Sequence, residues 1–154
     1  MLNESTVGAY VTDRNSFHPR TFGIFTWRSV RNRIPVRLEL DKRGIDLDSV
    51  RCPVCDESLE TVSHAIIECN LAKDVWDRVR LWWGVSANSN DTNTQSIFNL
   101  EQGNHRSNDG HKIWQAVKWV SGYLIWRNRN LKVFQNKCKI ALEILSEIQV
   151  KSFE

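Results

Sequence analysis

The chain has 154 residues, which suits one compact domain with its own core. Hydrophobic residues make up 41% of it, including seven Trp and six Phe, and the formal net charge is only +3, so most of the chain should fold. No apolar run approaches the roughly 18 residues that span a bilayer, and residues 1–13 lack the pattern of a secretory signal. We therefore expect an intracellular protein, in the nucleus or the cytoplasm, with no membrane partner.

The first part of the chain predicts two helices after a polar start. Residues 1–17 have little periodicity and are expected to be loosely ordered, apart from a possible short strand at 7–11. Apolar side chains at steps of three and four predict a helix over residues 20–33. Pro35 interrupts this helix, and residues 36–43 are expected to form a second short helix that a glycine closes.

The middle of the chain predicts two further helices and a loop. Residues 61–69 have helical spacing, which places His64 on a short helix, and residues 71–83 form the next helix, again followed by a glycine. Residues 86–111 are rich in Asn, Ser, Gln, Asp and Gly, so we expect a solvated loop with one turn at about 97–100.

The last third predicts the longest helix, over residues 113–134, and a final helix over 139–150. The long helix carries an aromatic stripe of Trp119, Tyr123 and Trp126 beside basic residues. Two interpretations of this stripe remain open: the rings belong to the core, as Trp at helical spacing usually does, or they stack on unpaired nucleic-acid bases.

Three cysteines and one histidine have the spacing of a zinc site, Cys52-x2-Cys55-x8-His64-x4-Cys69. Zinc prefers a closed tetrahedron of thiolate and imidazole ligands, and a Cys-x-x-Cys turn supplies two of its corners. His64 and Cys69 would lie about 140° apart on an ideal α-helix, so we expect Cys69 where that helix ends. Because protein ligands fill all four positions, the predicted ion is a single structural Zn²⁺ with no open site for a water nucleophile.

The alternative is that these residues are buried free thiols and an ordinary core histidine. A close Cys-x-x-Cys pair with a nearby histidine in a reducing compartment favours the metal over disulfides. Cys138 lies far away on a Lys-rich stretch and is expected to be an ordinary thiol.

The predicted fold is therefore mostly α: a small helical domain organised around a Cys-Cys-His-Cys zinc knuckle, followed by a long C-terminal helix pair. We divide the chain into a loosely ordered segment (1–17), a zinc-binding domain (18–84), a polar loop (85–111), and a C-terminal helical segment that packs on the domain (112–154).

Charge is unevenly distributed along the chain. Residues 14–51 carry nine basic and four acidic side chains (net +5), and residues 112–154 carry eight and three (net +5). Residues 52–69, which lie between these two basic segments, carry four acidic side chains and no Lys or Arg. Three thiolates around Zn²⁺ would give the metal centre a further net charge of about −1. The zinc knuckle itself should therefore repel a phosphate backbone.

The basic residues before the knuckle are candidate phosphate contacts. Counterion release would supply most of the affinity of such contacts for nucleic acid. The alternative is that they form only the solvated face of an amphipathic helix, because a charge run alone is weak evidence. The candidates are Arg20, Arg28, Arg31, Arg33, Arg37, Lys42 and Arg43.

Several short motifs in order resemble a known family over residues 18–83. The chain is similar to the reverse transcriptase zinc-binding domain that lies downstream of the polymerase in plant LINE-type (non-LTR) retrotransposons. A weaker similarity continues through Trp126-Arg127-x-Arg129-Asn130. The motifs are Ile24-Phe25-Thr26-Trp27-Arg28, Arg33-Ile34-Pro35-Val36-Arg37, Arg43-Gly44-Ile45-Asp46, Cys52-Pro53-Val54-Cys55, Glu60-Thr61-Val62-x-His64, Cys69, and Val75-Trp76.

The resemblance implies a function as well as a fold. The zinc positions of the family match the four proposed ligands one for one, and the parent proteins are RNA-directed DNA polymerases. Nothing in this chain resembles the aspartates of a Tyr-x-Asp-Asp strand or a ribonuclease H site, so we expect no enzyme activity. The chain looks like a detached or separately encoded copy of the domain.

Two classes of function follow from this resemblance. The first is a nucleic-acid-binding accessory module, with RNA or DNA as its partner. The second is a zinc-stabilised protein-interaction or scaffold module, which once packed on a reverse transcriptase core or another protein. A non-functional retrotransposon remnant is the third possibility.

Overall fold

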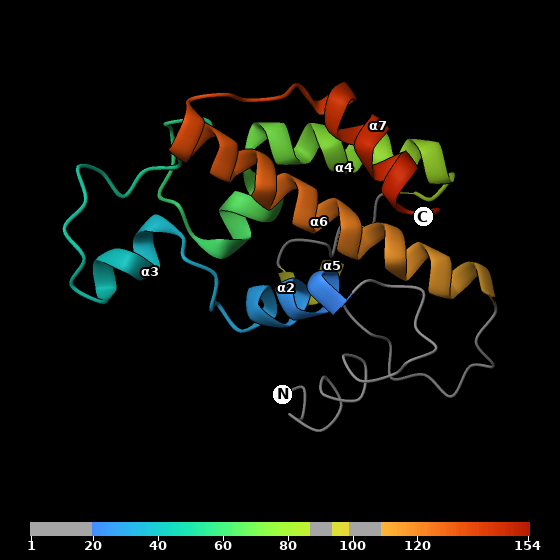
Figure 1. Cartoon of the computed structure of the whole chain (residues 1–154), viewed down its shortest axis with the longest axis horizontal. Coiled ribbons are helices and arrows are strands. Elements are labelled where there is room, and N and C mark those ends of the chain that lie inside the picture. Colours follow the sequence, from blue (N-terminus) through green and yellow to red (C-terminus); the bar gives the residue numbers. More distant parts are fainter. Residues whose placement is uncertain (1–19, 87–93, 99–108) are drawn as a thin grey trace.

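A computed structural model describes residues 20–86, 94–98 and 109–154 (Figure 1). The expected N-terminal segment, the strand at 7–11 and most of the polar loop lie outside these residues. The described part is mostly helical, as predicted, and its only β pairing is an isolated bridge between Arg51 and Leu59. The elements are α2 (Arg20–Val30), α3 (Arg37–Lys42), the π-helix η1 (His64–Glu68), α4 (Asn70–Trp83), α5 (Thr94–Ile97), α6 (Asp109–Gln135) and α7 (Ala141–Lys151).

Helix α2 ends three residues earlier than the sequence predicted. Asn32 adopts a left-handed conformation with φ of 53°, which no α-helix accommodates, and Asn tolerates it better than most residues. The chain turns back at this point, and the N–H of Arg33 donates a hydrogen bond to the carbonyl of Arg28 at 2.8 Å. The predicted end at Arg33 is therefore wrong because a local turn at Asn32 overrides the helical pattern.

The predicted glycine stops are confirmed. Gly44 follows α3 and Gly84 follows α4, with φ of 80° and 77°. The N–H of Gly84 donates to the carbonyl of Arg80 at 2.9 Å, which satisfies one of the free carbonyls at the end of α4. Left-handed backbone at these two positions costs glycine little.

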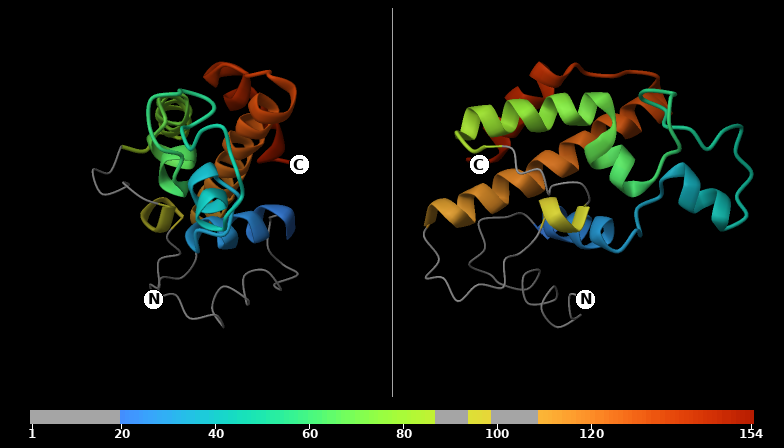
Figure 2. Two further views of the ribbon diagram at one scale, coloured as in Figure 1. Left: turned by 90° about the vertical axis from the view of Figure 1, so that its left-hand side faces the viewer. Right: turned by 180° about the vertical axis from the view of Figure 1, so that it is seen from behind.

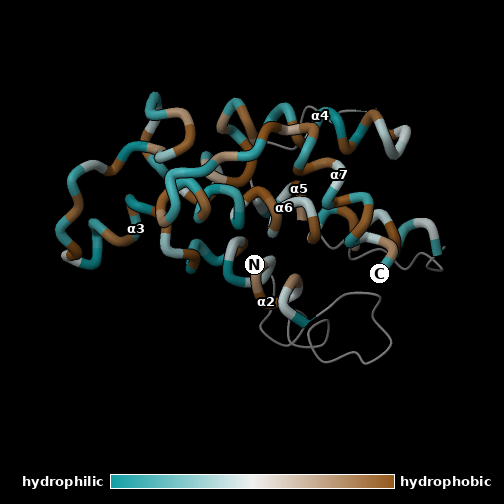
Figure 3. Tube along the Cα trace, turned by 45° about the horizontal axis from the view of Figure 1, so that its top comes forward, coloured by the Kyte–Doolittle hydropathy of each residue, from teal (hydrophilic) through white to brown (hydrophobic). Residues whose placement is uncertain are grey.

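Helix α6 lies in the middle of the molecule. Helices α4 and α7 run along one side of it, and α2 and α5 lie along the other (Figures 1 and 2). It begins at Asp109, four residues earlier than predicted, and its side chains Val117, Val120 and Leu124 are almost fully buried. Hydrophilic and hydrophobic residues alternate along the helices in Figure 3, as expected when each helix has one face on the core.

The aromatic stripe of α6 belongs to the interior. Trp119 is 4% exposed and Trp126 8%, so the hypothesis that these two rings stack on nucleic-acid bases is wrong. Tyr123 is half-buried, and its ring packs edge-on against Phe22 at 5.0 Å and Phe25 at 5.7 Å between centroids. The stripe therefore joins α6 to α2.

Helix α5 is anchored where the sequence predicted only a turn in a solvated loop. Its residue Ile97 and the following Phe98 are each 2% exposed. Phe98 lies directly over Gly122 of α6, because only a residue without a side chain leaves room for its ring. In the described part of the chain, no helix is both long and apolar enough to cross a membrane.

This close approach predicts that Gly122→Ala destabilises the fold. The added methyl group would come within 2.9 Å of Cε1 of Phe98 and closer still to Cζ, so the ring must move, at a cost of about 1–3 kcal/mol. Chemical denaturation would measure the loss, and Phe98→Leu in the same chain should recover part of it. Gly110→Ala is the control, because no neighbouring atom lies within 4 Å of the place that its added methyl group would occupy. Equal stability of the Gly122→Ala and Gly110→Ala variants would contradict the packing.

Candidate metal centre

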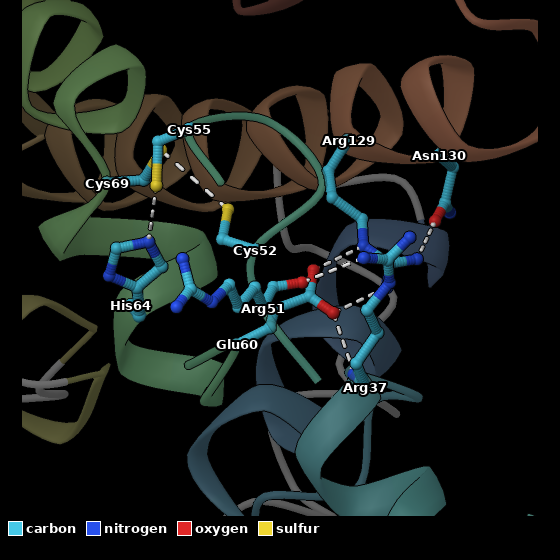
Figure 4. A network of polar contacts seen from close by, with 9 residues as sticks. All are labelled: Arg37, Arg51, Cys52, Cys55, Glu60, His64, Cys69, Arg129 and Asn130. Carbon is cyan, nitrogen blue, oxygen red and sulfur yellow. Dashed lines mark hydrogen bonds and ion pairs between the residues drawn. The ribbon is translucent and has the colours of Figure 1, made fainter. Parts of the chain in front are cut away.

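The structure gathers the four predicted zinc ligands at one point. The sulfur atoms of Cys52, Cys55 and Cys69 and a ring nitrogen of His64 all lie within 4.8 Å of one another. Cys52 Sγ and Cys69 Sγ are 4.0 Å apart, and Cys55 Sγ lies 3.3 Å from His64 Nε2 (Figure 4). A tetrahedral ion with Zn–S bonds of about 2.3 Å needs sulfur pairs about 3.8 Å apart. The four side chains therefore fit one zinc ion.

A short hairpin positions the two ligands of the Cys-x-x-Cys pair. The N–H of Cys52 donates to the carbonyl of Ser58, and the N–H of Asp56 donates to the carbonyl of Cys52, both at 2.8 Å. Asp56 takes the left-handed conformation, with φ of 55°, that reverses the chain after the second cysteine. The hairpin closes at the Arg51–Leu59 bridge, so both thiols are held on its tip.

A π-helical turn positions the other two ligands. The N–H of Cys69 donates to the carbonyl of His64 at 2.8 Å, a bond between residues five apart. This wider turn brings together two side chains that an α-helix would hold apart. The sequence correctly placed Cys69 at the end of the helix but did not predict the π-turn. Asn70 then begins α4 with ordinary backbone angles, although asparagine tolerates a left-handed conformation better than most residues.

The thiols of Cys52 and Cys69 have opposite pKa shifts without the metal. The thiol hydrogen bond from Cys52 lowers the pKa of Cys69, and the same bond, together with burial, raises the pKa of Cys52. Zn²⁺ binds thiolates, so it would displace the thiol protons of both side chains.

Glu60, at the end of the hairpin, forms a buried ion pair with α6. Its carboxylate is 0% exposed and accepts hydrogen bonds from Arg129 Nε at 2.5 Å and Nη2 at 2.6 Å (Figure 4). It also accepts the backbone N–H of Arg37 at 2.7 Å. The charge count along the sequence had included Glu60 in the acidic zinc knuckle. The structure instead buries it, so Glu60 is not part of an acidic surface. The sequence pointed to Arg129 only through the weak motif Trp126-Arg127-x-Arg129-Asn130, and that motif did not indicate a buried partner.

The candidate phosphate contacts have different surroundings. Arg37 is half-buried, and its guanidinium donates to the carbonyl of Arg51 at 2.9 Å, so this side chain supports the hairpin. Lys42 pairs with Glu39 at 2.9 Å. The remaining five are exposed, except for the half-buried Arg31: Arg20, Arg28, Arg31, Arg33 and Arg43. Their role in binding nucleic acid stays a prediction.

The match to a known family covers this site. Residues 13–76 match the family model for zinc-binding in reverse transcriptase. All four ligands lie inside the matched segment, so this part of the chain is similar to a zinc-binding domain of reverse transcriptases, and its four ligands suit one zinc ion. The match spans less than half of the chain and ends within α4. No curated protein and no solved structure was found to match.

The geometry predicts one zinc per chain and its loss when a ligand is removed. Cys52→Ser, Cys55→Ser and Cys69→Ser should each abolish tight binding, because a hydroxyl does not supply the thiolate that zinc needs. Lowering the pH should release the metal, since protons compete for the thiolates and the imidazole. Metal analysis across a pH series would measure both effects. Cys138→Ser is the control, because that thiol is exposed and outside the cluster. Full zinc occupancy in the Cys69→Ser protein would refute the assignment.

The ion pair predicts a large cost for removing Arg129. Arg129→Met leaves a carboxylate buried without its partner, which should cost about 3–5 kcal/mol of unfolding free energy. Replacing both residues, as Glu60→Leu with Arg129→Met, should cost less than the single change, because no buried charge remains. Arg127→Met is the control, since that arginine is exposed two residues away. Denaturant unfolding of the four zinc-loaded proteins would measure the differences, and an equal loss in the two single variants would contradict the prediction.

Proposed function

We propose that the chain is a nucleic-acid-binding accessory module, without catalytic activity, that derives from the reverse transcriptase of a plant LINE-type retrotransposon. Two findings support this proposal: the family match to a zinc-binding rather than a catalytic domain, and a basic surface within the matched segment. The first of them accounts for the zinc. The second supplies the contacts for RNA or DNA.

The basic surface lies on the outer side of α2 and the turn that follows it. No acidic residue occurs between positions 14 and 38 of the sequence. Among the described residues, Arg20, Arg28 and Arg33 form no ion pair, so their charges are not neutralised within this part of the protein. Such a surface attracts a polyanion and gains affinity from the counterions that it releases.

The zinc loop has the opposite charge and supports a structural role for the ion. Asp56, Glu57 and Glu68 are exposed around a centre whose three thiolates leave a net charge of about −1. A phosphate backbone would avoid this surface. In our proposal, zinc orders the hairpin, and Glu60 of the hairpin then fixes the first residue of α3.

A protein-interaction or scaffold role is the second candidate. It is supported by two exposed apolar side chains, Phe134 near the end of α6 (78% exposed) and Phe153 after the end of α7 (67% exposed). The described structure does not say what would cover them, so nucleic-acid binding is the better-supported proposal.

The test is a triple variant of the basic surface. Replacing Arg28, Arg31 and Arg33 with Gln should weaken binding to every nucleic-acid sequence alike, because phosphate contacts carry no sequence information. The slope of log binding constant against log salt concentration should also become shallower, by the equivalent of up to about three phosphate contacts. Fluorescence anisotropy across a salt series would measure both quantities.

Two matched variants control for net charge. Replacing the exposed Lys73, Lys112 and Lys137 with Gln removes the same charge elsewhere and should have a smaller effect. Neutralising Asp56, Glu57 and Glu68 should leave binding unchanged or slightly stronger. If the arginine variant is folded, zinc-loaded and binds as well as the parent, the basic surface is only solvated, and the interaction role takes the lead.

A further inference from the structure

Two arginine side chains converge on one tryptophan at the end of α2. The guanidinium carbons of Arg31 and Arg33 lie 5.0 Å and 5.4 Å from the centroid of the Trp27 ring. Both distances are within the range of a cation–π contact, and Trp is the aromatic residue that makes the strongest such contact. We call these three residues the Trp27 cluster.

The turn after α2 is what brings the second arginine back. Arg31 lies one helical turn beyond Trp27, on the same face. On a continued helix, Arg33 would point about 120° away from Trp27. The left-handed Asn32 and the bond from the Arg33 N–H to the Arg28 carbonyl reverse the chain instead. The backbone therefore gathers positive charge at one place.

This gathering of charge favours an anionic ligand. Like charges held close together repel, and Arg33 has no acidic partner among the described residues. Stacking on the ring also restricts the guanidinium groups, so less side-chain entropy is lost when a ligand binds. An anion bound at this cluster would relieve the repulsion with only a small loss of side-chain entropy.

The shape of the guanidinium group narrows the class of ligand. Its edge donates hydrogen bonds to phosphate oxygens, and its plane stacks on flat rings. Arg33 is exposed, so a base can approach the guanidinium plane from the side away from Trp27. A duplex hides the faces of its bases, whereas an unpaired base presents them, and unpaired bases stack on arginine planes as well as on aromatic rings.

We propose that the Trp27 cluster is a single-strand site, which binds a phosphate of unpaired RNA or DNA and stacks one base on an arginine held against Trp27. This inference rests on the proposed nucleic-acid function and narrows its substrate to single strands. Single-stranded RNA and single-stranded DNA share the chemistry that the cluster recognises.

The experiment compares single strands with the matching duplex. Labelled RNA and DNA strands of about 12 nucleotides, and their duplexes, are titrated with the full zinc-loaded chain by fluorescence anisotropy. We expect the chain to bind either single strand at least about fivefold more tightly than the duplex. The separate RNA and DNA strands show which of the two is preferred.

A charge-conserving variant isolates the stacking. Arg31→Lys with Arg33→Lys keeps both positive charges but removes both planes, so single-strand affinity should fall about fivefold while duplex affinity and the salt dependence stay the same. The control is Arg78→Lys on α4, which makes the same substitution at an arginine paired with Asp74 and should change nothing. Zinc content and the melting temperature confirm that each variant is folded.

The outcomes separate this proposal from the one on which it rests. Equal affinity for strand and duplex, or an unchanged single-strand affinity in the lysine variant, overturns the single-strand site and leaves general nucleic-acid binding in place. Absence of binding to every nucleic acid overturns both. An oligoglutamate peptide that binds as tightly as the single strands would assign the cluster to an acidic protein instead.

Discussion

The buried ion pair between Glu60 and Arg129 is the constraint that joins the two halves of the described structure. The residues are 69 positions apart, and both are almost fully buried, with Arg129 only 5% exposed. Burying two charges is costly unless each finds enough partners. Glu60 accepts three hydrogen bonds here, and Arg129 lies over the ring of Trp126 at 4.7 Å and donates to Asn130. These partners offset the cost of burying the two charges, and the pair holds the zinc loop against α6.

Zinc and Glu60 act on the same hairpin from its two ends. The metal holds the tip, through Cys52 and Cys55, while the N–H of Glu60 donates to the carbonyl of Val50 at 2.9 Å and closes the base. A hairpin this short has little apolar contact of its own to stabilise it. Zinc binding at its tip and the hydrogen bonds of Glu60 at its base are therefore expected to stabilise each other. The backbone bond from Arg37 to Glu60 extends this order to the start of α3. Metal binding, the ion pair and the turn into the basic segment are thus physically connected.

Local signals in the sequence predicted the features that depend on neighbours in the chain. Three predictions were confirmed because spacing and backbone preference are local properties: the clustering of the four candidate zinc ligands, the stops at Gly44 and Gly84, and the helix predicted over 71–83, which the structure has as Asn70–Trp83. The π-turn was not predicted, since the bond from Cys69 to His64 replaces α-helical bonds of similar strength and leaves no mark in the residue pattern. Glu60 looked like any acidic loop residue, because nothing near it in sequence reveals a partner 69 positions away. The motif Trp126-Arg127-x-Arg129-Asn130 contained that partner, and only the fold shows why those residues belong together.

The structural unit extends beyond the segment that the family model matches. That segment ends at Trp76, yet α4 continues to Trp83 and packs on both α6 and α7. Val75 and Val79 of α4 are fully buried, and Ile144 and Ile148 of α7 are at most 2% exposed. A unit that ended at residue 76 would expose these apolar faces and leave the Glu60 carboxylate without its guanidinium partner. Zinc can order the hairpin and the π-turn, but it replaces neither the apolar contacts of α4 nor the charge of Arg129. In this chain, the zinc-binding domain and the C-terminal helices therefore share one interior, which the apolar contacts and the Glu60–Arg129 ion pair hold together.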